Sequence, residues 1–244
     1  MEVPSERVSS IYICVRSVAD PCRHFNSSTG GVMKILNLYA GIGGNRKLWT
    51  PKGNEHDITA VEYKPEIAAI YQDFFPNDKV IITDAHQYLL NHFAEYDFIW
   101  TSPPCPSHSR FRFMTTKMTN PKYSRPVVYP DMALYQEIIL LKHYFGGKWV
   151  VENVKGYYEP LIKTQKIDRH YIWANFLIPS IWVDNVNFIK KHAGELDNRH
   201  DFDLSKYKLS GRKDQILRNC VDPTVGKRIL EYAINPIKTQ GELI

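Results

Sequence analysis

The feature that most constrains this chain is a regular alternation of short apolar runs with helical stretches, which begins at Met33. The runs expected to form strands are Lys34–Tyr39, Asp57–Glu62, Lys79–Thr83, Asp97–Thr101 and Lys148–Val151. The stretches expected to form helices are Pro65–Phe74, Ala85–His92 and Asp131–Tyr144. Strands that alternate with helices predict an α/β fold built on a doubly wound, mostly parallel sheet. A chain of 244 residues is long enough for one such domain and a small lobe.

Residues suited to chemistry fall where the expected strands end. They are Gly41 and Gly43 after the first strand, Glu62, Asp84, Cys105 and Glu152. In an open parallel sheet the carboxyl ends of the strands share one edge, and ligands bind there. We therefore expect glycines, acids and a cysteine to meet at one cleft.

The cofactor half of this cleft centres on the glycine-rich turn Ala40-Gly-Ile-Gly-Gly44. The turn lacks the third, spaced glycine of the dinucleotide fingerprint, which disfavours NAD. Glu62, at the next strand end, can accept hydrogen bonds from two ribose hydroxyls, and Asp84 is placed to meet an adenine amino group. A nucleoside without a pyrophosphate fits this arrangement, and S-adenosyl-L-methionine is such a ligand. Helix capping or solvation is the alternative role of the two acids.

Composition adds a few limits. The net charge of +5, with an isoelectric point near 8.9, favours an anionic partner. No apolar stretch reaches the roughly 18 residues that a membrane span needs. The four cysteines match neither a zinc pattern nor a disulfide framework, so a reducing cytoplasm is the expected compartment. Residues 1–32 contain the linker-like stretch Asn26–Gly31, and we expect a disordered extension whose removal leaves activity unchanged.

Four motifs resemble those of the DNA (cytosine-5) methyltransferases. They are Leu36-Asn-Leu-Tyr-Ala-Gly-Ile-Gly-Gly44, Ser102-Pro-Pro-Cys105, Val151-Glu-Asn-Val154 and Arg218-Asn-Cys-Val-Asp-Pro-Thr-Val-Gly226. They follow the family order, and the resemblance runs from Leu36 to Ala233. It implies a Rossmann-like methyltransferase fold of the compact kind found in bacteria or phages, with S-adenosyl-L-methionine as cofactor. The cofactor contacts that it implies are Tyr39, Gly41, Gly43, Glu62, Asp84, Pro103 and Asn219.

The resemblance also assigns the chemistry. Cys105 is the expected nucleophile, because attack by a thiolate at carbon 6 makes carbon 5 of cytosine reactive toward a methyl group. Glu152 is expected to stabilise the ring at N3, which requires a carboxyl group with a raised pKa. Asn153 is expected to help hold this loop. The alternative for Cys105 is a buried cysteine at a strand end.

Because carbon 5 is inaccessible inside a duplex, the resemblance implies that the target base is flipped into the cleft. The segment Cys105–Pro130 suits a loop that closes over double-stranded DNA, since it holds basic and aromatic residues but no Asp or Glu. Ser109, Arg110 and Arg112 are the candidate DNA contacts. A solvated basic loop is the alternative.

Three positions depart from the family pattern. Pro106 stands where glutamine usually follows the cysteine, and Arg218 stands where glycine is common. The Arg-x-Arg motif is reduced to Arg169, in Asp168-Arg-His-Tyr-Ile-Trp-Ala-Asn175. Either Arg169 makes the missing contact with cytosine or His170 shares it, so Arg169 is the third candidate catalytic residue.

The expected organisation is a catalytic domain over 33–175, a small target-recognition region over 176–217, and a segment 218–244 that returns to the catalytic domain. We expect a monomer that acts on DNA. An RNA cytosine-5 methyltransferase and a catalytically weak DNA-binding homologue are the alternatives. Neither the recognition sequence nor a partner restriction enzyme can be inferred from the sequence.

Overall fold

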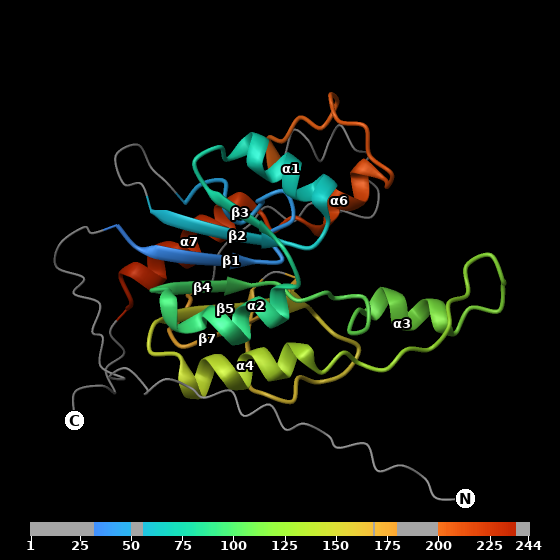
Figure 1. Cartoon of the computed structure of the whole chain (residues 1–244). Helices are drawn as coiled ribbons and strands as arrows, with labels where there is room; N and C mark the ends of the chain where they lie inside the picture. Colours follow the sequence, from blue (N-terminus) through green and yellow to red (C-terminus); the bar gives the residue numbers. More distant parts are fainter. Residues whose placement is uncertain (1–31, 50–55, 168, 180–199, 238–244) are drawn as a thin grey trace, which may run out of the picture.

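The computed structural model describes residues 32–49, 56–167, 169–179 and 200–237 (Figure 1). The predicted N-terminal extension lies outside these residues, apart from exposed Val32. Within the described ranges, no helix has the length and apolar character required to cross a membrane.

A seven-stranded sheet forms the centre of the molecule, in the order β3-β2-β1-β4-β5-β7-β6. Its strands are β1 (Lys34–Leu38), β2 (Asp57–Glu62), β3 (Lys79–Ile82), β4 (Phe98–Thr101), β5 (Lys148–Val154), β6 (Gln165–Ile167) and β7 (His170–Ala174). The first five are parallel, while β7 runs antiparallel to both β5 and β6. The predicted doubly wound, mostly parallel sheet is therefore confirmed.

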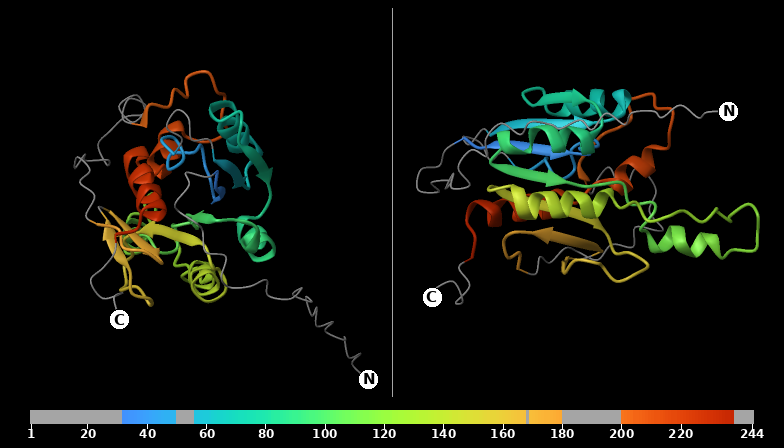
Figure 2. Two further views of the ribbon diagram at one scale, coloured as in Figure 1. Left: turned by 90° about the vertical axis from the view of Figure 1, so that its left-hand side faces the viewer. Right: turned by 60° about the horizontal axis from the view of Figure 1, so that its bottom comes forward.

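Helices cover both faces of the sheet (Figure 2). They are α1 (Pro65–Phe74), α2 (Ala85–His92), the short 3-10 helix η1 (Phe93–Glu95), α3 (Arg110–Thr116), α4 (Ala133–Tyr144), α6 (Lys213–Asn219) and α7 (Pro223–Ile234). Helices α1 and α7 lie on one face, and α2 and α4 lie on the other. Both faces of the parallel strands are thus buried, which explains why those strands read as continuous apolar runs.

The core has a separate cluster on each face. On the α7 face, Trp49, Phe98 and Trp100 pack with Ile229 and other side chains of α7. On the opposite face, Leu89 of α2 and Leu141 of α4 pack over the strands. Residues near both ends of the described chain therefore share the first cluster.

Two sequence-based expectations need correction. Strand β5 does not end at Val151 but continues to Val154, because antiparallel β7 pairs with it beyond the end of β4. Glu152 therefore lies within a strand, opposite Ile172, although it is still one residue beyond the part of β5 paired with β4. The segment Cys105–Pro130 is not a plain loop, since it contains α3.

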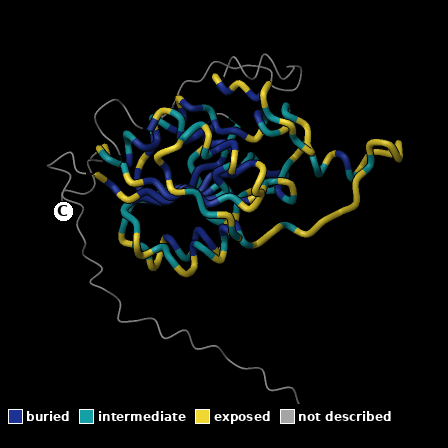
Figure 3. Tube along the Cα trace, turned by 45° about the horizontal axis from the view of Figure 1, so that its top comes forward, coloured by how far each residue is buried: buried dark blue, intermediate teal, exposed yellow. Residues whose placement is uncertain are grey.

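Residues 110–132, called the arm below, project from the sheet edge where the parallel strands end (Figure 1). Most of the arm is exposed (Figure 3). Its base is fixed by an antiparallel bridge between Ser109 and Gly156 and by stacking of Phe113 on Tyr157, with ring centroids 4.5 Å apart. These contacts give the local reason why α3 forms.

The described end of the expected target-recognition region packs on α1. Phe202, Leu204 and Leu217 are buried in one cluster with Ile42 and Ile67. Residues 180–199 of that region lie outside the described residues. Its boundaries stay a prediction.

Candidate active site

The turn after β1 has an unusual backbone. Tyr39, Gly41 and Gly43 have φ angles of +54°, +55° and +86°. A Cβ atom at Gly43 would lie 2.3 Å from the ring of Phe75, so this glycine is required by packing. A Cβ atom at Gly41 would meet nothing within 4 Å. The turn therefore faces open space at Gly41.

Glu62 and Asp84 both accept hydrogen bonds from backbone amides, and only Glu62 reaches the turn after β1. The Glu62 carboxylate accepts hydrogen bonds from the amides of Gly41 (3.0 Å) and Lys64 (2.9 Å). Asp84 caps α2 by accepting from the amide of Gln87 at 2.8 Å. Capping, the alternative considered for Asp84, is thus one of its roles. A carboxylate has further lone pairs, so both acids retain capacity for a ligand.

Cys105 follows β4 at the same edge of the sheet and is partly buried. Its carbonyl accepts hydrogen bonds from the amides of His108 and Ser109, both at 3.0 Å, which fixes the turn after it. Burial and the charge of Glu152 raise the pKa of the thiol, while Arg169 opposes the shift. Cys105, Glu152 and Arg169 therefore act on one another electrostatically.

Glu152 is buried, and burial raises its pKa to about 7 despite the opposing effects of Ser102 and Arg169. His170 Nε2 lies 3.5 Å from Glu152 Oε1. Burial, together with the charges of Arg169 and Lys155, lowers the pKa of His170 to about 3, so its ring is neutral near pH 7. A neutral imidazole leaves Glu152 free to hold a proton, as the expected chemistry requires.

Asn153 joins the two halves of the chemistry. Its side-chain amide donates to the carbonyl of Pro103 at 3.0 Å, which ties β5 to the Ser102-Pro-Pro-Cys105 segment. The expected holding role of Asn153 agrees with this contact.

The closing segment reaches both halves of the site. Arg169 donates to the carbonyl of Arg218 at 3.4 Å. Asn219 is exposed and accepts a hydrogen bond from Gln215. The next residue, Cys220, packs so closely on Gly44 that a Cβ atom there would lie 2.8 Å from its own. The structure thus brings the neighbours of Asn219 to the glycine turn, whereas a cofactor contact by Asn219 stays a prediction.

The proposed nucleic-acid contacts lie at the base of the arm. Arg110 donates to the carbonyl of Gly156 at 3.1 Å, and Arg112 donates to that of Pro126 at 3.2 Å. Ser109 forms the bridge to Gly156. These three residues shape the arm, and their contacts with DNA stay predictions.

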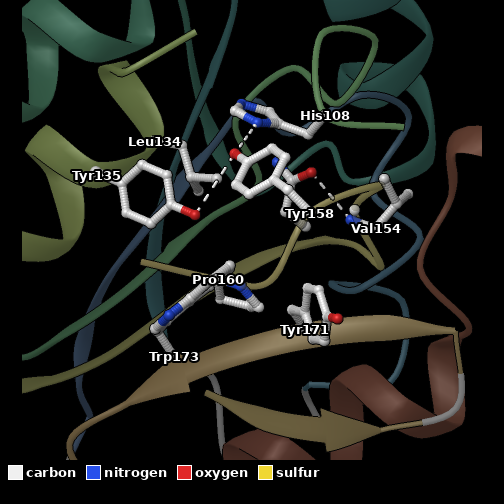
Figure 4. Close-up of a pocket in the computed structure, with 10 residues that line it drawn as sticks. His108, Leu134, Tyr135, Val154, Tyr158, Pro160, Tyr171 and Trp173 are labelled. Atoms are coloured by element: carbon white, nitrogen blue, oxygen red, sulfur yellow. Dashed lines mark hydrogen bonds between the residues drawn. The ribbon is translucent and has the colours of Figure 1, made fainter. Parts of the chain in front are cut away.

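A small cavity of about 10 Å³ lies between the segments that follow β4 and β5 (Figure 4). His108 lines it, and its Nδ1 is 2.6 Å from the hydroxyl of Tyr158. Among the described residues, buried His108 Nε2 has no hydrogen-bond partner. The space is large enough for about one water molecule. His108, which lines the cavity, also donates its amide N–H to the Cys105 carbonyl, in the turn that follows that residue.

Sequence reasoning missed Glu137. This residue of α4 is buried and lies among apolar neighbours of the same helix, such as Leu134, Ile138 and Leu141. Its carboxylate binds side chains from three other elements. The sequence feature that could have identified Glu137 is an acidic residue on the apolar side of a helix, because a buried charge requires partners.

Comparison with known proteins identifies a family that matches this chain and proteins that are similar to it. Residues 33–160 match the family of C-5 cytosine-specific DNA methylases. A tRNA (cytosine(38)-C(5))-methyltransferase from Spodoptera frugiperda is 26% identical over 153 residues, covering 59% of this chain and 43% of that protein. The chain thus matches less than half the length of this curated relative.

A solved methyltransferase structure shares the fold. The methyltransferase EhMeth of Entamoeba histolytica has a TM-score of 0.52 at 13% identity, with coverage of 86% of this chain and 100% of that one. A DNMT2 variant from Spodoptera frugiperda has a TM-score of 0.34 at 27% identity, with coverage of 51% and 36%. The expected Rossmann-like methyltransferase fold is confirmed.

Proposed function

Since the chain belongs to the C-5 cytosine-specific DNA methylase family, we propose that it methylates carbon 5 of cytosine in DNA, with S-adenosyl-L-methionine as methyl donor and Cys105 as nucleophile. The observation that carries this proposal is the position of Cys105 and buried Glu152 at the carboxyl ends of the paired strands β4 and β5, where Asn153 ties β5 to the segment that carries Cys105. A thiol near a buried carboxyl group whose pKa is raised to about 7 suits addition to a cytosine ring.

Cys105 acts first. Its thiolate forms a bond to carbon 6 of a flipped-out cytosine, and the electron pair of the 5,6 double bond moves into the ring, toward carbon 5. When bound, S-adenosyl-L-methionine would supply an electrophilic methyl group to carbon 5, as its sulfur–methyl bond breaks and the neutral thioether S-adenosyl-L-homocysteine leaves. Removal of the carbon-5 proton by a base then restores the double bond and releases Cys105 as a thiolate.

Glu152 makes this addition possible in two ways. As a protonated carboxyl, it donates a hydrogen bond to N3 and stabilises the charge that develops in the ring. Protonation also removes the negative charge that raises the pKa of the Cys105 thiol. The proton on Glu152 therefore favours both the electrophile and the nucleophile.

Arg169 is the proposed third catalytic residue, because its charge lowers the pKa of both the Cys105 thiol and Glu152. A guanidinium there can also donate to the cytosine carbonyl oxygen. His170 is neutral and lies beside Glu152, where a ring N–H can donate to the carboxyl oxygen that carries no proton, so the Glu152 proton stays available for N3. The two residues together replace the missing arginine in our proposal.

The donor set around the glycine turn fits the methyl donor. Open space lies beside Gly41, and Glu62 is anchored to the amide of that residue. Carboxylates suit ribose hydroxyls and an adenine amino group, and the turn lacks the third, spaced glycine of the dinucleotide fingerprint. We assign the contacts to the residues predicted for the cofactor, namely Tyr39, Gly41, Gly43, Glu62, Asp84, Pro103 and Asn219.

DNA is the preferred substrate because of the arm, whose lysines and arginines are not offset by any Asp or Glu from Cys105 to Pro130. Such a surface suits phosphates, and Ser109, Arg110 and Arg112 lie at its base, a few residues after Cys105 in the chain. RNA is the second candidate, because the curated relative is named as a tRNA methyltransferase. In either case the target base has to leave its stack.

The test is transfer of a labelled methyl group to duplex DNA and to RNA, with Cys105→Ser as the matched control. Label in DNA that disappears in the variant supports the proposal, and bisulfite sequencing then reports the site. Label in RNA alone would move the proposal to the second candidate. DNA that contains 5-fluorocytosine should trap a covalent adduct. Binding without adduct or transfer would identify a catalytically weak DNA-binding homologue instead.

A further inference from the structure

A buried carboxylate beneath the site links elements that are far apart in sequence. Glu137 has a fully buried side chain. Its Oε1 accepts a hydrogen bond from the Tyr39 hydroxyl at 2.6 Å and lies 3.0 Å from His86 Nδ1. Its Oε2 accepts from the Thr101 hydroxyl at 2.6 Å. Three side chains thus converge on one carboxylate.

The three partners each adjoin a part of the proposed site. Tyr39 directly follows β1 and precedes the turn with Gly41. Thr101 ends β4 and begins the run that carries Cys105. His86 stands two residues after Asp84, in the first turn of α2. One side chain therefore connects the cofactor turn to the strand that presents the nucleophile.

Because the Glu137 carboxylate is buried, the fold depends on its hydrogen bonds. A buried carboxylate without partners is costly, whereas charge-assisted hydrogen bonds are short and strong. Burial and Glu137 raise the pKa of Tyr39 far above its usual range, so its hydroxyl stays a donor. The bond to Glu137 also raises the pKa of His86, which favours an imidazolium paired with the carboxylate.

The backbone of Tyr39 shows what the bond achieves. A φ of +54° is uncommon for a residue other than glycine and is maintained only where surrounding contacts require it. The hydrogen bond from its hydroxyl to Glu137 is such a contact. It fixes the ring at the edge of the cofactor turn while the backbone bends toward Gly41.

We propose that Glu137 is a positioning residue that sets the cofactor turn, through Tyr39, and the Cys105 segment, through Thr101, at one fixed separation. The proposal rests on the proposed function, in which the methyl donor and the thiol must reach the same cytosine. A small misplacement of reacting groups is enough to slow a reaction strongly. Glu137 acts through its neighbours and is not itself a catalytic residue.

The test separates the two arms of the network. Tyr39→Phe keeps the ring but removes one hydrogen bond, and should weaken binding of S-adenosyl-L-methionine by about 5- to 20-fold in calorimetry. Thr101→Val removes the other bond. It should change the affinity by less than about twofold, yet alter the rate at which iodoacetamide alkylates Cys105 and slow methyl transfer about tenfold.

Variants of Glu137 itself should combine these effects. Glu137→Leu should weaken the cofactor and change the alkylation rate together. Glu137→Gln should recover much of both, because an amide can still accept from Tyr39 and donate to Thr101. The double variant of Tyr39→Phe with Glu137→Gln should lose less than the sum of the single losses.

Matched controls exist outside the network. Tyr88→Phe removes a hydroxyl that pairs with Tyr96, and Glu95→Gln alters an exposed carboxylate that pairs with His92. Both should leave cofactor affinity and alkylation unchanged. Thermal unfolding of every variant shows which proteins are folded, and only folded ones are compared.

The outcomes distinguish this inference from the proposed function. If the folded Glu137 variants keep wild-type affinity and alkylation rate, Glu137 is merely structural and the inference is overturned. The predicted changes in affinity and alkylation, without methyl transfer to any nucleic acid, would refute the proposed function and support the inference. A wild-type chain that does not bind S-adenosyl-L-methionine would overturn both.

Discussion

At the scale of single residues, the proposed chemistry depends on two groups whose pKa values rise because they are buried. The Cys105 thiol is harder to ionise than a free thiol, and Glu152 titrates at about 7. Either raised pKa would be unfavourable in a residue with only a structural role, because burying a charged group reduces stability. Together they suit a site in which a carboxyl group must keep its proton until a substrate arrives.

Replacement of Cys105 by serine tests the nucleophile directly. Cys105→Ser should reduce methyl transfer below detection, because a serine hydroxyl at neutral pH is a far weaker nucleophile than a thiol. Binding of S-adenosyl-L-methionine, measured by calorimetry, should stay close to wild type. Cys220→Ser is the matched control, since this buried thiol lies directly after α6 and has no role in the proposed chemistry. Full transfer by Cys105→Ser would refute the assignment.

The pH dependence of stability tests Glu152. Its folded pKa lies above the ordinary value of 4.5, so the protonated form is favoured in the folded state and stability is lost as pH rises from about 4.5 through about 7. Relative to Glu152→Gln, the wild-type protein should therefore lose about 3 kcal/mol between pH 4.5 and pH 8.

Urea unfolding of both proteins at several pH values measures this difference, and other titrating groups cancel in the comparison. At pH 8, Glu152→Gln should be more stable than the wild-type protein but should lack methyl-transfer activity. A difference that does not change with pH would show that Glu152 has an ordinary pKa.

At the scale of elements, the prediction from sequence succeeded where local pattern decides the structure. The first five strands and helices α1, α2 and α4 follow the expected ranges to within a few residues, because parallel strands buried on both faces are continuous apolar runs. Strands β6 and β7 were not predicted, since they are short and depend on antiparallel pairing with β5. Helix α3 was missed because it is only 7 residues long and is fixed by contacts with Gly156 and Tyr157, which are distant in sequence.

The site divides in the same way. Residues at strand ends could be predicted because the topology of a parallel sheet gathers them at one edge. The network of Glu137 could not, because its partners at positions 39, 86 and 101 are separated in sequence by whole elements. Nothing in a local pattern relates a tyrosine after one strand to an acid on a distant helix.

The contact between α7 and the glycine turn yields a prediction at this scale. A Cβ atom at Gly226 would lie 2.2 Å from the carbonyl oxygen of Asn45, so the helix would have to shift. Gly226→Ala should destabilise the protein by about 1–3 kcal/mol and weaken cofactor binding. Thr224→Ala, at an exposed position of the same helix, is the control. Equal thermal stability of the two variants would contradict the close approach.

The arm should govern the salt dependence of binding to nucleic acid. Lys117 and Lys122 are exposed on it. Replacing both by alanine should reduce the slope of log affinity against log salt by up to about two units. The control replaces Lys79 and Lys142, which are exposed at the start of β3 and the end of α4, at the opposite edge of the sheet. Filter binding over a salt series should show an unchanged slope for the control, and an unchanged slope for the arm variant would remove the arm from the interface.

At the scale of the whole molecule, segments from the two ends of the described chain pack together. Strand β1 and helix α7, from its two ends, contribute to one cluster around Trp49 and Trp100. The glycine turn is backed by Cys220, and the base of the arm is tied to the segment after β5. The carboxyl edge of the sheet is therefore held by segments from the whole length of the described chain.

Because segments from both ends of the described chain share one core, a destabilising substitution in α7 should lower the stability of the whole domain. Ile229 is fully buried in the cluster that contains Trp49, Phe98 and Trp100. Ile229→Ala should cost about 2–5 kcal/mol, because it removes buried methyl groups and leaves a cavity. Arg228→Ala, at an exposed position of the same helix, should change stability by less than about 0.5 kcal/mol.

Urea unfolding followed by tryptophan fluorescence and by far-ultraviolet circular dichroism provides the measurement. The fluorescence reports the packing of both clusters, since Trp49 and Trp100 lie in the cluster on the α7 face and Trp149 and Trp173 lie in the cluster on the opposite face. The dichroism reports the helices on both faces. If the two faces of the sheet form one cooperative core, both signals should move to lower urea together in Ile229→Ala. Separate transitions would show that the domain does not unfold as one unit, and the carboxyl edge of the sheet would then not be held as one unit either.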